Sequence, residues 1–341
     1  EAEAEAEAEA EAEAEAEAEA EAEAEAEAEA EAEAEAAAEA ETKGGPSTSG
    51  FRPKKRKALQ MPSPPWWRDS NMFDFSFENP LDGKFKDLPV VERLIQDYPE
   101  QVRLKGTSYC HYGRDYRKRT VFVTSLPNFQ PIGPCGGNPC FWVRAGRNHP
   151  GDVLGCSTSL KNSLPGPLID LLINSWMQRH ATGVAEQRVQ RYLLLDVFSG
   201  WGSVSSRVAE KKLNGEWPGL CVYSNDIVDR GHTDITLDMS ADSVWDVEIL
   251  LKFAIQSCWK ELGVEKPSVA HPGGIIGWVN ENKIAVLFHC STPCSTYSLV
   301  GLKSHRKGKT LEPSTQTARD HDAMNAKLID YFKRVVLSSP M

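Results

Sequence analysis

The stretch Tyr192–Gly202 (YLLLDVFSGWG) decides the fold class. Its first seven residues are apolar except for Asp196, which is typical of a strand that is buried on both faces. Ser199–Gly202 (SGWG) then forms a glycine-rich turn, and the residues Val204–Lys212 have the apolar spacing of a helix. A buried strand, a glycine turn and a helix in this order are typical of a cofactor-binding unit in an α/β protein.

Strand and helix patterns alternate on either side of this unit. Short apolar or β-branched runs predict strands, and apolar residues at helical spacing predict helices. Such alternation predicts a mostly parallel sheet with helices on both faces and with ligands at the carboxyl ends of its strands. The further predicted strands are Met72–Glu78, Thr120–Thr124, Leu220–Tyr223 and Lys283–His289, and the further helices are Leu88–Tyr98, Leu164–Met177, Val244–Leu262 and Ala323–Val336.

Charge is distributed unevenly along the 341 residues, whose net charge is −11. Residues 1–42 alternate Glu and Ala and hold 20 of the 49 acidic side chains, so the remaining 299 residues carry 29 acidic and 38 basic groups, a net charge of +9. A basic body excludes a simple acidic enzyme and admits a polyanionic partner. We expect residues 1–42 to form a disordered or fraying helical tail, because Glu recurs at i, i+4 and no apolar face is present.

Two further regions follow the tail. Residues 43–65 are rich in Gly, Pro, Ser and basic residues and are predicted to be a linker. Their cluster Lys54–Lys57 is either a solvated stretch or a nuclear import signal or phosphate-binding arm. Residues 66–341 are predicted to form the folded domain, in which residues 127–161, rich in Gly, Pro, Cys and Asn, form an irregular insert.

No run of 18 apolar residues and no secretory signal occurs in the sequence, so no membrane span is expected. The eight cysteines are scattered, which predicts reduced thiols in an intracellular protein. Cys135, Cys140, His149 and Cys156 have the ligand types of a structural zinc site, although their spacing is looser than that of paired C-x2-C motifs. Zinc binding and ordinary loop thiols therefore both remain open.

The turn after Tyr192–Phe198 is the candidate cofactor site. Its glycines let the backbone approach a ligand, and the following helix offers amide donors at its N-terminus. Asp226, at the end of the next strand, is expected to bond ribose hydroxyls, and Asp234 and Asp238 supply further acids. The alternative is a structural turn beside solvated acids.

Three other loops carry reactive or charged side chains. Cys294, in Pro293-Cys294, follows a buried strand and has the polar neighbours that suit a nucleophilic thiolate, whereas Cys290 is expected to be a packed thiol. Glu78, in Glu78-Asn79-Pro80, is a candidate general acid or a solvated turn residue. Arg117–Arg119 (RKR) is a candidate phosphate contact or a solvated basic face.

Together these segments resemble the cytosine-5 DNA methyltransferases over about residues 66–338. The resemblance implies a Rossmann-like class I S-adenosylmethionine-dependent methyltransferase fold. Asp196–Gly202 (DVFSGWG) resembles the motif that holds S-adenosylmethionine, Pro293-Cys294 the catalytic Pro-Cys, Glu78-Asn79 the Glu-Asn motif, Arg117 and Arg119 the Arg-x-Arg motif, and Asn162–Pro167 (NSLPGP) the closing motif, whose turn opens a helix against the cofactor site.

These motifs stand in a permuted order. In the family the cofactor motif comes first, and Pro-Cys, Glu-Asn, Arg-x-Arg, a recognition region and the closing motif follow. In this chain Glu-Asn, Arg-x-Arg and the closing motif precede the cofactor motif and Pro-Cys, so joining Val336 to Trp66 restores the usual order. A circular permutation explains this, because new ends between a surface helix and a strand are tolerated. A slice of a tandem array would give the same order.

The resemblance implies methyl transfer to C5 of a cytosine that is flipped out of duplex DNA. The Cys294 thiolate would add to C6 while Glu78 protonates N3, so that C5 attacks the methyl group. A base then removes the C5 proton, and Cys294 leaves. Asn79 would fix the loop, and Arg117 and Arg119 would hold the target nucleotide or orient Glu78.

The resemblance also implies which residues hold S-adenosylmethionine, and it leaves the target open. Ser295 and Tyr297 replace the usual Gln and Phe after Pro-Cys, Tyr116 replaces a common Gln, and the recognition stretch is short. The expected cofactor residues are Asp196, Phe198, Ser199, Gly200 and Gly202 in the turn, Asp226 at the ribose, Asp238 or, as the second choice, Asp234 at the adenine amino group, and Asn162 in the closing motif.

Three alternatives remain. They are an RNA cytosine-5 methyltransferase on the same fold, a nucleic-acid-binding relic of a mobile element without activity, and a zinc-stabilised DNA-binding module. Intact Cys294, Glu78 and the glycine turn argue against the relic. For a nucleic-acid partner we expect phosphate contacts from Lys54–Lys57, Arg114–Arg119 and Lys303–Lys309, and a nuclear location.

Overall fold

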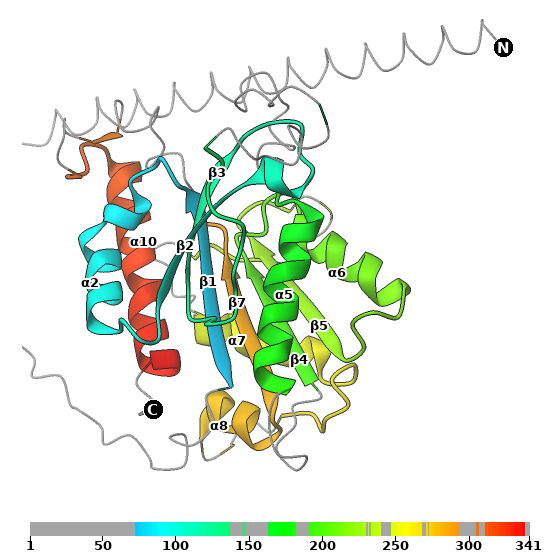
Figure 1. The fold of residues 1–341 in the computed structure, drawn as a ribbon. Helices are drawn as coiled ribbons and strands as arrows, with labels where there is room; N and C mark the ends of the chain where they lie inside the picture. The colour runs from blue at the N-terminus through cyan, green and yellow to red at the C-terminus, as the bar shows by residue number, and fades with distance from the viewer. Residues whose placement is uncertain are drawn as a thin grey trace, which may run out of the picture. The chain divides into compact units, whose positions relative to one another are not determined.

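The computed structural model describes residues 72–136, 146, 163–181, 191–229, 231, 233–239, 247–267, 271, 273–292, 305–306 and 311–337. Within these residues one seven-stranded sheet has the order β2-β3-β1-β7-β4-β5-β6 (Figure 1). The strands are β1 (Phe73–Pro80), β2 (Arg103–Ser108), β3 (Arg119–Thr124), β4 (Arg191–Val197), β5 (Leu220–Asp226), β6 (Ile235–Thr236) and β7 (Ile284–Cys290).

Only β3 runs against the other strands of this sheet. It pairs antiparallel with β1 on one side and with β2 on the other, while β1, β7, β4, β5 and β6 pair in parallel. The predicted α/β class with a mostly parallel sheet is therefore confirmed. The described helices are α2 (Pro89–Asp97), α5 (Gly166–Ala181), α6 (Ser203–Leu213), α7 (Val247–Cys258), α8 (Gly274–Glu281) and α10 (Gln316–Phe332), with short turns η2 (Phe85–Asp87), η3 (Tyr109–Tyr112) and η5 (Lys333–Leu337).

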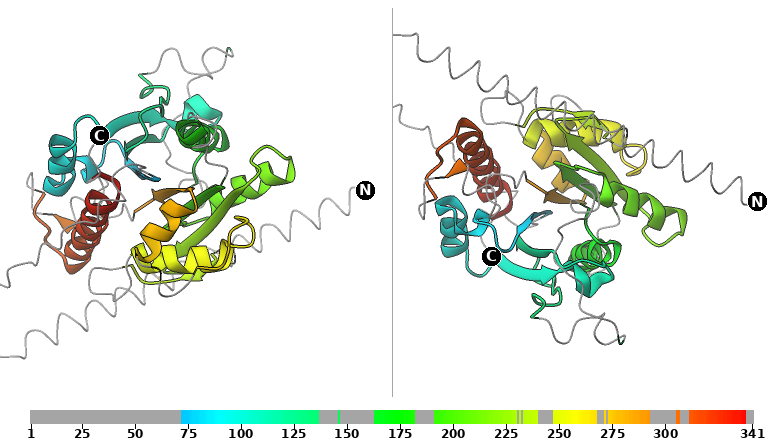
Figure 2. Two further views of the ribbon diagram at one scale, coloured as in Figure 1. Left: turned by 90° about the horizontal axis from the view of Figure 1, so that it is seen from below. Right: turned by 90° about the horizontal axis from the view of Figure 1, so that it is seen from above.

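Helices cover both faces of the sheet, as predicted (Figure 2). Side chains of a strand alternate between the two faces, so Phe75 and Phe77 of β1 point one way and Asp74 points the other. The ring of Phe332 in α10 stacks on Phe75 at 5.1 Å between centroids and meets Phe77 edge-on at 5.4 Å, so α10 lies on the phenylalanine face. Helix α5 lies on the opposite face, where it reaches Asp74 and packs against α6.

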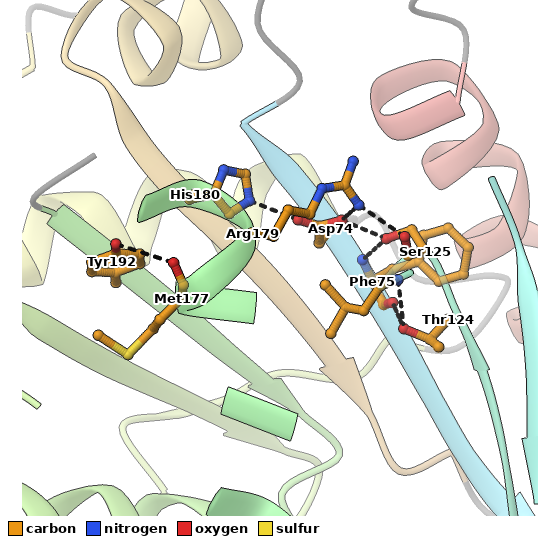
Figure 3. Close-up of polar contacts among 9 residues, drawn as sticks. Asp74, Phe75, Thr124, Ser125, Met177, Arg179, His180 and Tyr192 are labelled. Atoms are coloured by element: carbon orange, nitrogen blue, oxygen red, sulfur yellow. Dashed lines mark hydrogen bonds and ion pairs between the residues drawn. The ribbon is translucent and has the colours of Figure 1, made fainter. Parts of the chain in front are cut away.

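A buried carboxylate fastens α5 to β1 (Figure 3). Asp74 has no exposed surface, and its Oδ1 accepts hydrogen bonds from the hydroxyl of Ser125 at 2.7 Å and from the guanidinium of Arg179 at 2.6 Å. The ring of His180 contacts Oδ2 of Asp74 at 2.7 Å. Arg179 and His180 end α5, so this network fixes the helix relative to the strand.

The last described helix packs against the first described strand. After α10, the turn η5 contacts β1, and Phe332 stacks on Phe75 and makes a tilted ring contact with Phe288 of the neighbouring strand β7. The segment from Gln316 to Leu337 is thus adjacent to β1.

Several elements differ from the sequence prediction. Helix α10 begins at Gln316 rather than Ala323, because the Thr315 hydroxyl caps it by accepting from the amide of Ala318 at 3.2 Å. Strand β1 continues to Pro80, two residues beyond the predicted end at Glu78, so the segment Glu78-Asn79-Pro80 belongs to the strand and is not a loop after it. Strand β2 and helix α8 were not predicted.

Candidate functional site

Four parallel strands end level with one another, at one edge of the sheet. The last paired residues of these strands lie side by side across the sheet, and each is followed by a residue at the edge. These following residues are Glu78 on β1, Ser291 after β7, Phe198 after β4 and Asp226 on β5. The Glu-Asn segment, the glycine turn and the ribose candidate therefore meet along this carboxyl edge, where α/β proteins bind ligands. The register positions that align them are Phe77, Cys290, Val197 and Asn225.

The glycine turn has three residues in the left-handed region. The φ angles are 61° at Phe198, 55° at Gly200 and 64° at Gly202, which caps α6. Glycine adopts this conformation without steric cost, but at Phe198 it costs roughly 1–2 kcal/mol. The turn holds this shape because the amide of Ser199 donates to the carbonyl of Asn225 at 3.0 Å. A strained non-glycine residue at a sheet edge is typical of a functional loop.

Asp226 shapes the glycine turn. Its Oδ2 accepts from the amide of Gly200 at 2.7 Å and its Oδ1 from the amide of Val228 at 3.2 Å. Each carboxylate oxygen keeps a second lone pair, and Asp226 is half-buried, so it can still accept from ligand hydroxyls. The Gly200 amide, however, is already used within the protein.

The two other acids of this region differ from each other. Oδ2 of Asp234 accepts from both the amide and the hydroxyl of Ser224, at 2.7 and 2.8 Å, so this carboxylate braces a turn. Asp238 is exposed on the segment after β6. Asp234 is exposed as well, so burial does not separate the two adenine candidates.

Polar side chains are buried in a row just below the carboxyl edge. Ser76, His289 and Asp196 occupy paired positions of β1, β7 and β4, on the face that α5 covers, and each is at most 1% exposed. The Ser76 hydroxyl, Nδ1 of His289 and Oδ2 of Asp196 have no hydrogen-bond partner among the described residues. Buried unpaired polar atoms are rare in native proteins, and such a group is typical of a place that binds a polar ligand or water.

Burial changes the protonation of two members of this row. It raises the pKa of Asp196 to about 8, and the nearby negative charge of Asp226 acts in the same direction. It lowers the pKa of His289 to about 4, although the charge of Glu78 acts in the opposite direction. At neutral pH Asp196 is therefore mostly protonated and His289 is neutral.

Glu78 is held by two side chains that the sequence analysis did not single out. The hydroxyl of Tyr109 donates to Oε1 of Glu78 at 3.1 Å, and the ammonium of Lys118 lies 3.7 Å from the same oxygen. Lys118 also lies over the ring of Tyr109, at 5.0 Å from its centroid. Lys118 is the middle residue of the RKR segment, so only Tyr109 lacked any signal in the sequence.

Asn79 joins the end of β1 to the segment after β7. Its Nδ2 donates to the hydroxyl of Thr292 at 2.9 Å, and both side chains are buried. These residues are 213 positions apart in the sequence. Thr292 directly precedes Pro293-Cys294, which lie outside the described residues, so the Glu-Asn segment contacts the residue that leads into the Pro-Cys segment.

The two expected arginines flank Lys118 in the sequence. The guanidinium of Arg119 pairs with Asp82 at 2.9 Å, with both side chains largely exposed. Arg117 is half-buried. Among the expected phosphate contacts, Arg306 is buried and bonds to Asp322 at 2.6 Å, so it faces the protein interior rather than a phosphate.

The closing segment approaches the start of α6. The amide of Leu164 donates to the hydroxyl of Ser203 at 3.2 Å, and Arg114 donates to the hydroxyl of Ser163 at 2.9 Å. Helix α5 then begins at Gly166, as the closing motif predicts, and a Cβ at Gly166 would lie 3.3 Å from the Arg207 side chain. Asn162 itself lies outside the described residues.

The zinc candidates fall mostly outside the described residues. Cys135 is a buried cysteine near the end of the segment 72–136, while Cys140, His149 and Cys156 are among the residues that are not described. Among the described residues there is no group of three His, Cys, Asp or Glu side chains that could hold a metal ion. In the same part of the chain, no helix is long and apolar enough to cross a membrane.

Comparison of the sequence with family models and with curated proteins found no match. The functional assignment therefore rests on the residues and geometry given above.

Proposed function

We propose that this protein transfers a methyl group from S-adenosylmethionine to C5 of cytosine in DNA. The observation that carries the proposal is the hydrogen bond from Asn79 to Thr292. It brings the Glu78-Asn79 motif next to the segment that continues into Pro293-Cys294, and two residues span at most about 7 Å. The same edge carries the turn Phe198–Gly202, so the Glu-Asn motif, the glycine turn and the residue that leads into Pro-Cys lie at one edge of the sheet.

The residues at the edge fit the cofactor. S-adenosylmethionine has an amino-acid end, ribose hydroxyls and an adenine, and when bound it supplies the methyl group. The unpaired Oδ2 of buried Asp196 and the unpaired hydroxyl of Ser199 offer polar partners beside the glycine turn. Asp226 keeps lone pairs for the ribose hydroxyls, and the exposed carboxylate of Asp238 would accept from the adenine amino group. Asn162 would contribute from the closing motif.

The chain's own side chains would perform the covalent chemistry. Sγ of the Cys294 thiolate would bond to C6 of the cytosine while the carboxyl of Glu78 gives a proton to N3. The electron pair at C5 would then take the methyl group as its bond to the sulfonium sulfur breaks, with S-adenosylhomocysteine as the leaving group. When a base removes the C5 proton, the C6–sulfur bond breaks, Cys294 leaves as a thiolate and the proton on N3 returns to Glu78. Asn79 would keep the loop after β7 in register with Glu78.

Basic side chains near the edge support a nucleic-acid substrate. Arg114, Arg117 and Lys118 precede β3 and Arg119 begins it, and the next residue, Thr120, pairs with Pro80 at the end of β1. The body of the chain carries a net charge of +9. Contacts of this kind to phosphates would give an affinity that falls steeply with salt.

Methyl incorporation tests the proposal. The full chain, Cys294→Ser and the matched variant Cys258→Ser, whose thiol is buried in α7 on the far side of β5, are incubated with labelled S-adenosylmethionine and with duplex DNA or tRNA. We expect label at C5 of cytosine in DNA with the full chain and Cys258→Ser, and none with Cys294→Ser. Label in tRNA alone would favour the RNA enzyme, and no label in either substrate would refute the proposal.

A further inference from the structure

Both partners of Glu78 contact the same oxygen. Tyr109 donates to Oε1, and the Lys118 ammonium is nearest to Oε1 as well. Among the described residues Oε2 of Glu78 has no hydrogen-bond or ion-pair partner, and the residue is 7% exposed. The two oxygens of this carboxyl group are therefore not equivalent. Oε1 is held by Tyr109 and Lys118, whereas Oε2 is available to a ligand.

In its hydrogen bond with Glu78, the Tyr109 hydroxyl is the donor and the carboxyl oxygen is the acceptor. The phenol is completely buried, and burial together with the charge of Glu78 raises its pKa well above the usual value. The phenol of Tyr109 therefore stays protonated throughout the pH range in which proteins are folded. Because it donates its proton to Oε1 of Glu78, Oε1 acts as the acceptor in this hydrogen bond. The amide of Tyr109 bonds to the carbonyl of Lys118 at 3.0 Å, which fixes the two partners relative to each other.

We infer that Tyr109 is a positioning residue that holds Oε1 of Glu78 and leaves Oε2 as the oxygen that exchanges a proton with N3 of the cytosine. This inference rests on the proposed function. Lys118 assists from the solvent side, since its side chain is 14% exposed and its ammonium lies over the Tyr109 ring. The charged or titratable groups that interact with Glu78 are thus Tyr109 on η3, Lys118 before β3 and His289 on β7.

A purely structural role predicts a different result from a positioning role. If Tyr109 only filled space, Tyr109→Phe would be silent, because phenylalanine keeps the ring in the core. If it positions Glu78, the rotation of the freed carboxyl group lowers the rate of the chemical step without changing the affinity for DNA or cofactor. The matched control is Tyr112→Phe, which removes a phenol from the same turn η3, where it accepts from the amide of Ile132 at 3.0 Å.

The experiment measures kcat and KM for methyl transfer in the full chain, Tyr109→Phe and Tyr112→Phe. We expect kcat of Tyr109→Phe to fall about tenfold or more, because a hydrogen bond to a charged group is lost, with both KM values within about twofold of the unmutated chain. Lys118→Gln is expected to give a smaller loss. Equal kcat values for Tyr109→Phe and Tyr112→Phe would overturn the inference.

Isotope-edited infrared spectroscopy supplies a readout that does not depend on turnover. With ¹³C-labelled Glu, the Glu78 carboxylate band is identified by its loss in Glu78→Gln. We expect the band to shift in Tyr109→Phe and to stay in place in Tyr112→Phe. An unshifted band in Tyr109→Phe would overturn the inference even if methyl transfer occurs, whereas a shifted band without any methyl transfer would refute the proposed function and leave the contact between Tyr109 and Glu78 standing.

Discussion

Replacing Asp196 by Asn should make the protein more stable at neutral and alkaline pH. In the folded protein, burial and then the charge of Asp226 raise the pKa of Asp196 from 3.8 to about 8. Below about pH 4 the carboxyl group of Asp196 is protonated in both the folded and the unfolded chain, so its ionisation does not change the free energy of unfolding. As the pH rises from 4 to 8 the unfolded chain releases this proton and the folded chain retains it, so folding becomes progressively less favourable.

The size of the effect follows from the two pKa values. The difference between 3.8 and about 8 corresponds to about 6 kcal/mol at most, reached near pH 8, with a slope of about 1.4 kcal/mol per pH unit in between. Asn has nearly the same shape and does not ionise, so the free energy of unfolding of Asp196→Asn should lack this contribution. The gain of the variant over the unmutated chain should therefore be small at pH 5 and largest at pH 8.

Urea unfolding of the full chain at several pH values between 5 and 8 measures this difference. The control is Asp97→Asn, whose side chain is 51% exposed beside Lys333 and which should change the free energy of unfolding by less than about 0.5 kcal/mol at every pH. If the curves for Asp196→Asn and the unmutated chain run parallel across this range, Asp196 is ionised in the folded protein, and the description of the buried polar row is wrong.

Three other changes have expected outcomes. Asp74→Asn should lower the free energy of unfolding by about 3 kcal/mol in urea titrations, because Arg179 and His180 lose a buried charged acceptor; a loss below about 1 kcal/mol would mean that the network does not hold α5. Gly200→Ala should cost about 1 kcal/mol through its φ of 55° and weaken binding of S-adenosylhomocysteine in calorimetry, and unchanged affinity would argue against the turn as the cofactor site. Deletion of residues 1–42 should tighten DNA binding at low salt in anisotropy titrations and leave S-adenosylhomocysteine binding unchanged, and equal DNA affinity would show that the acidic tail does not compete.

The buried strands were predictable because a strand that is buried on both faces has a nearly continuous run of apolar residues in the sequence. Tyr192–Phe198 and Lys283–His289 are nearly continuous apolar runs, and they form the central strands β4 and β7. Edge elements leave a weaker signal. Strand β2 (RLKGTS) carries two basic residues and a glycine, and helix α8 (GIIGWVNE) is short and holds two glycines, so neither has the length or period that its structure usually requires.

The candidate site was predictable where its parts follow a strand, and unpredictable where they depend on contacts between distant residues. Glu78 and the turn at Gly200 stand beside recognisable strands. The contact between Tyr109 and Glu78 joins η3 to β1, and the buried row exists only because β1, β7 and β4 align in register. Asp234 was considered a ligand candidate from its position, but its bonds to Ser224 are visible only in three dimensions.

Covalent trapping tests the central claim most directly. Duplex DNA containing 5-fluorocytosine cannot release the enzyme after methyl transfer, because fluorine at C5 cannot be removed as a proton. With S-adenosylmethionine present, we predict a stable adduct of the full chain with this DNA, whose linkage peptide mapping assigns to Cys294, and none with Cys294→Ser. An adduct at another residue, or no adduct together with no methyl incorporation, would contradict the assignment of Cys294 and Glu78 to one methyltransferase site.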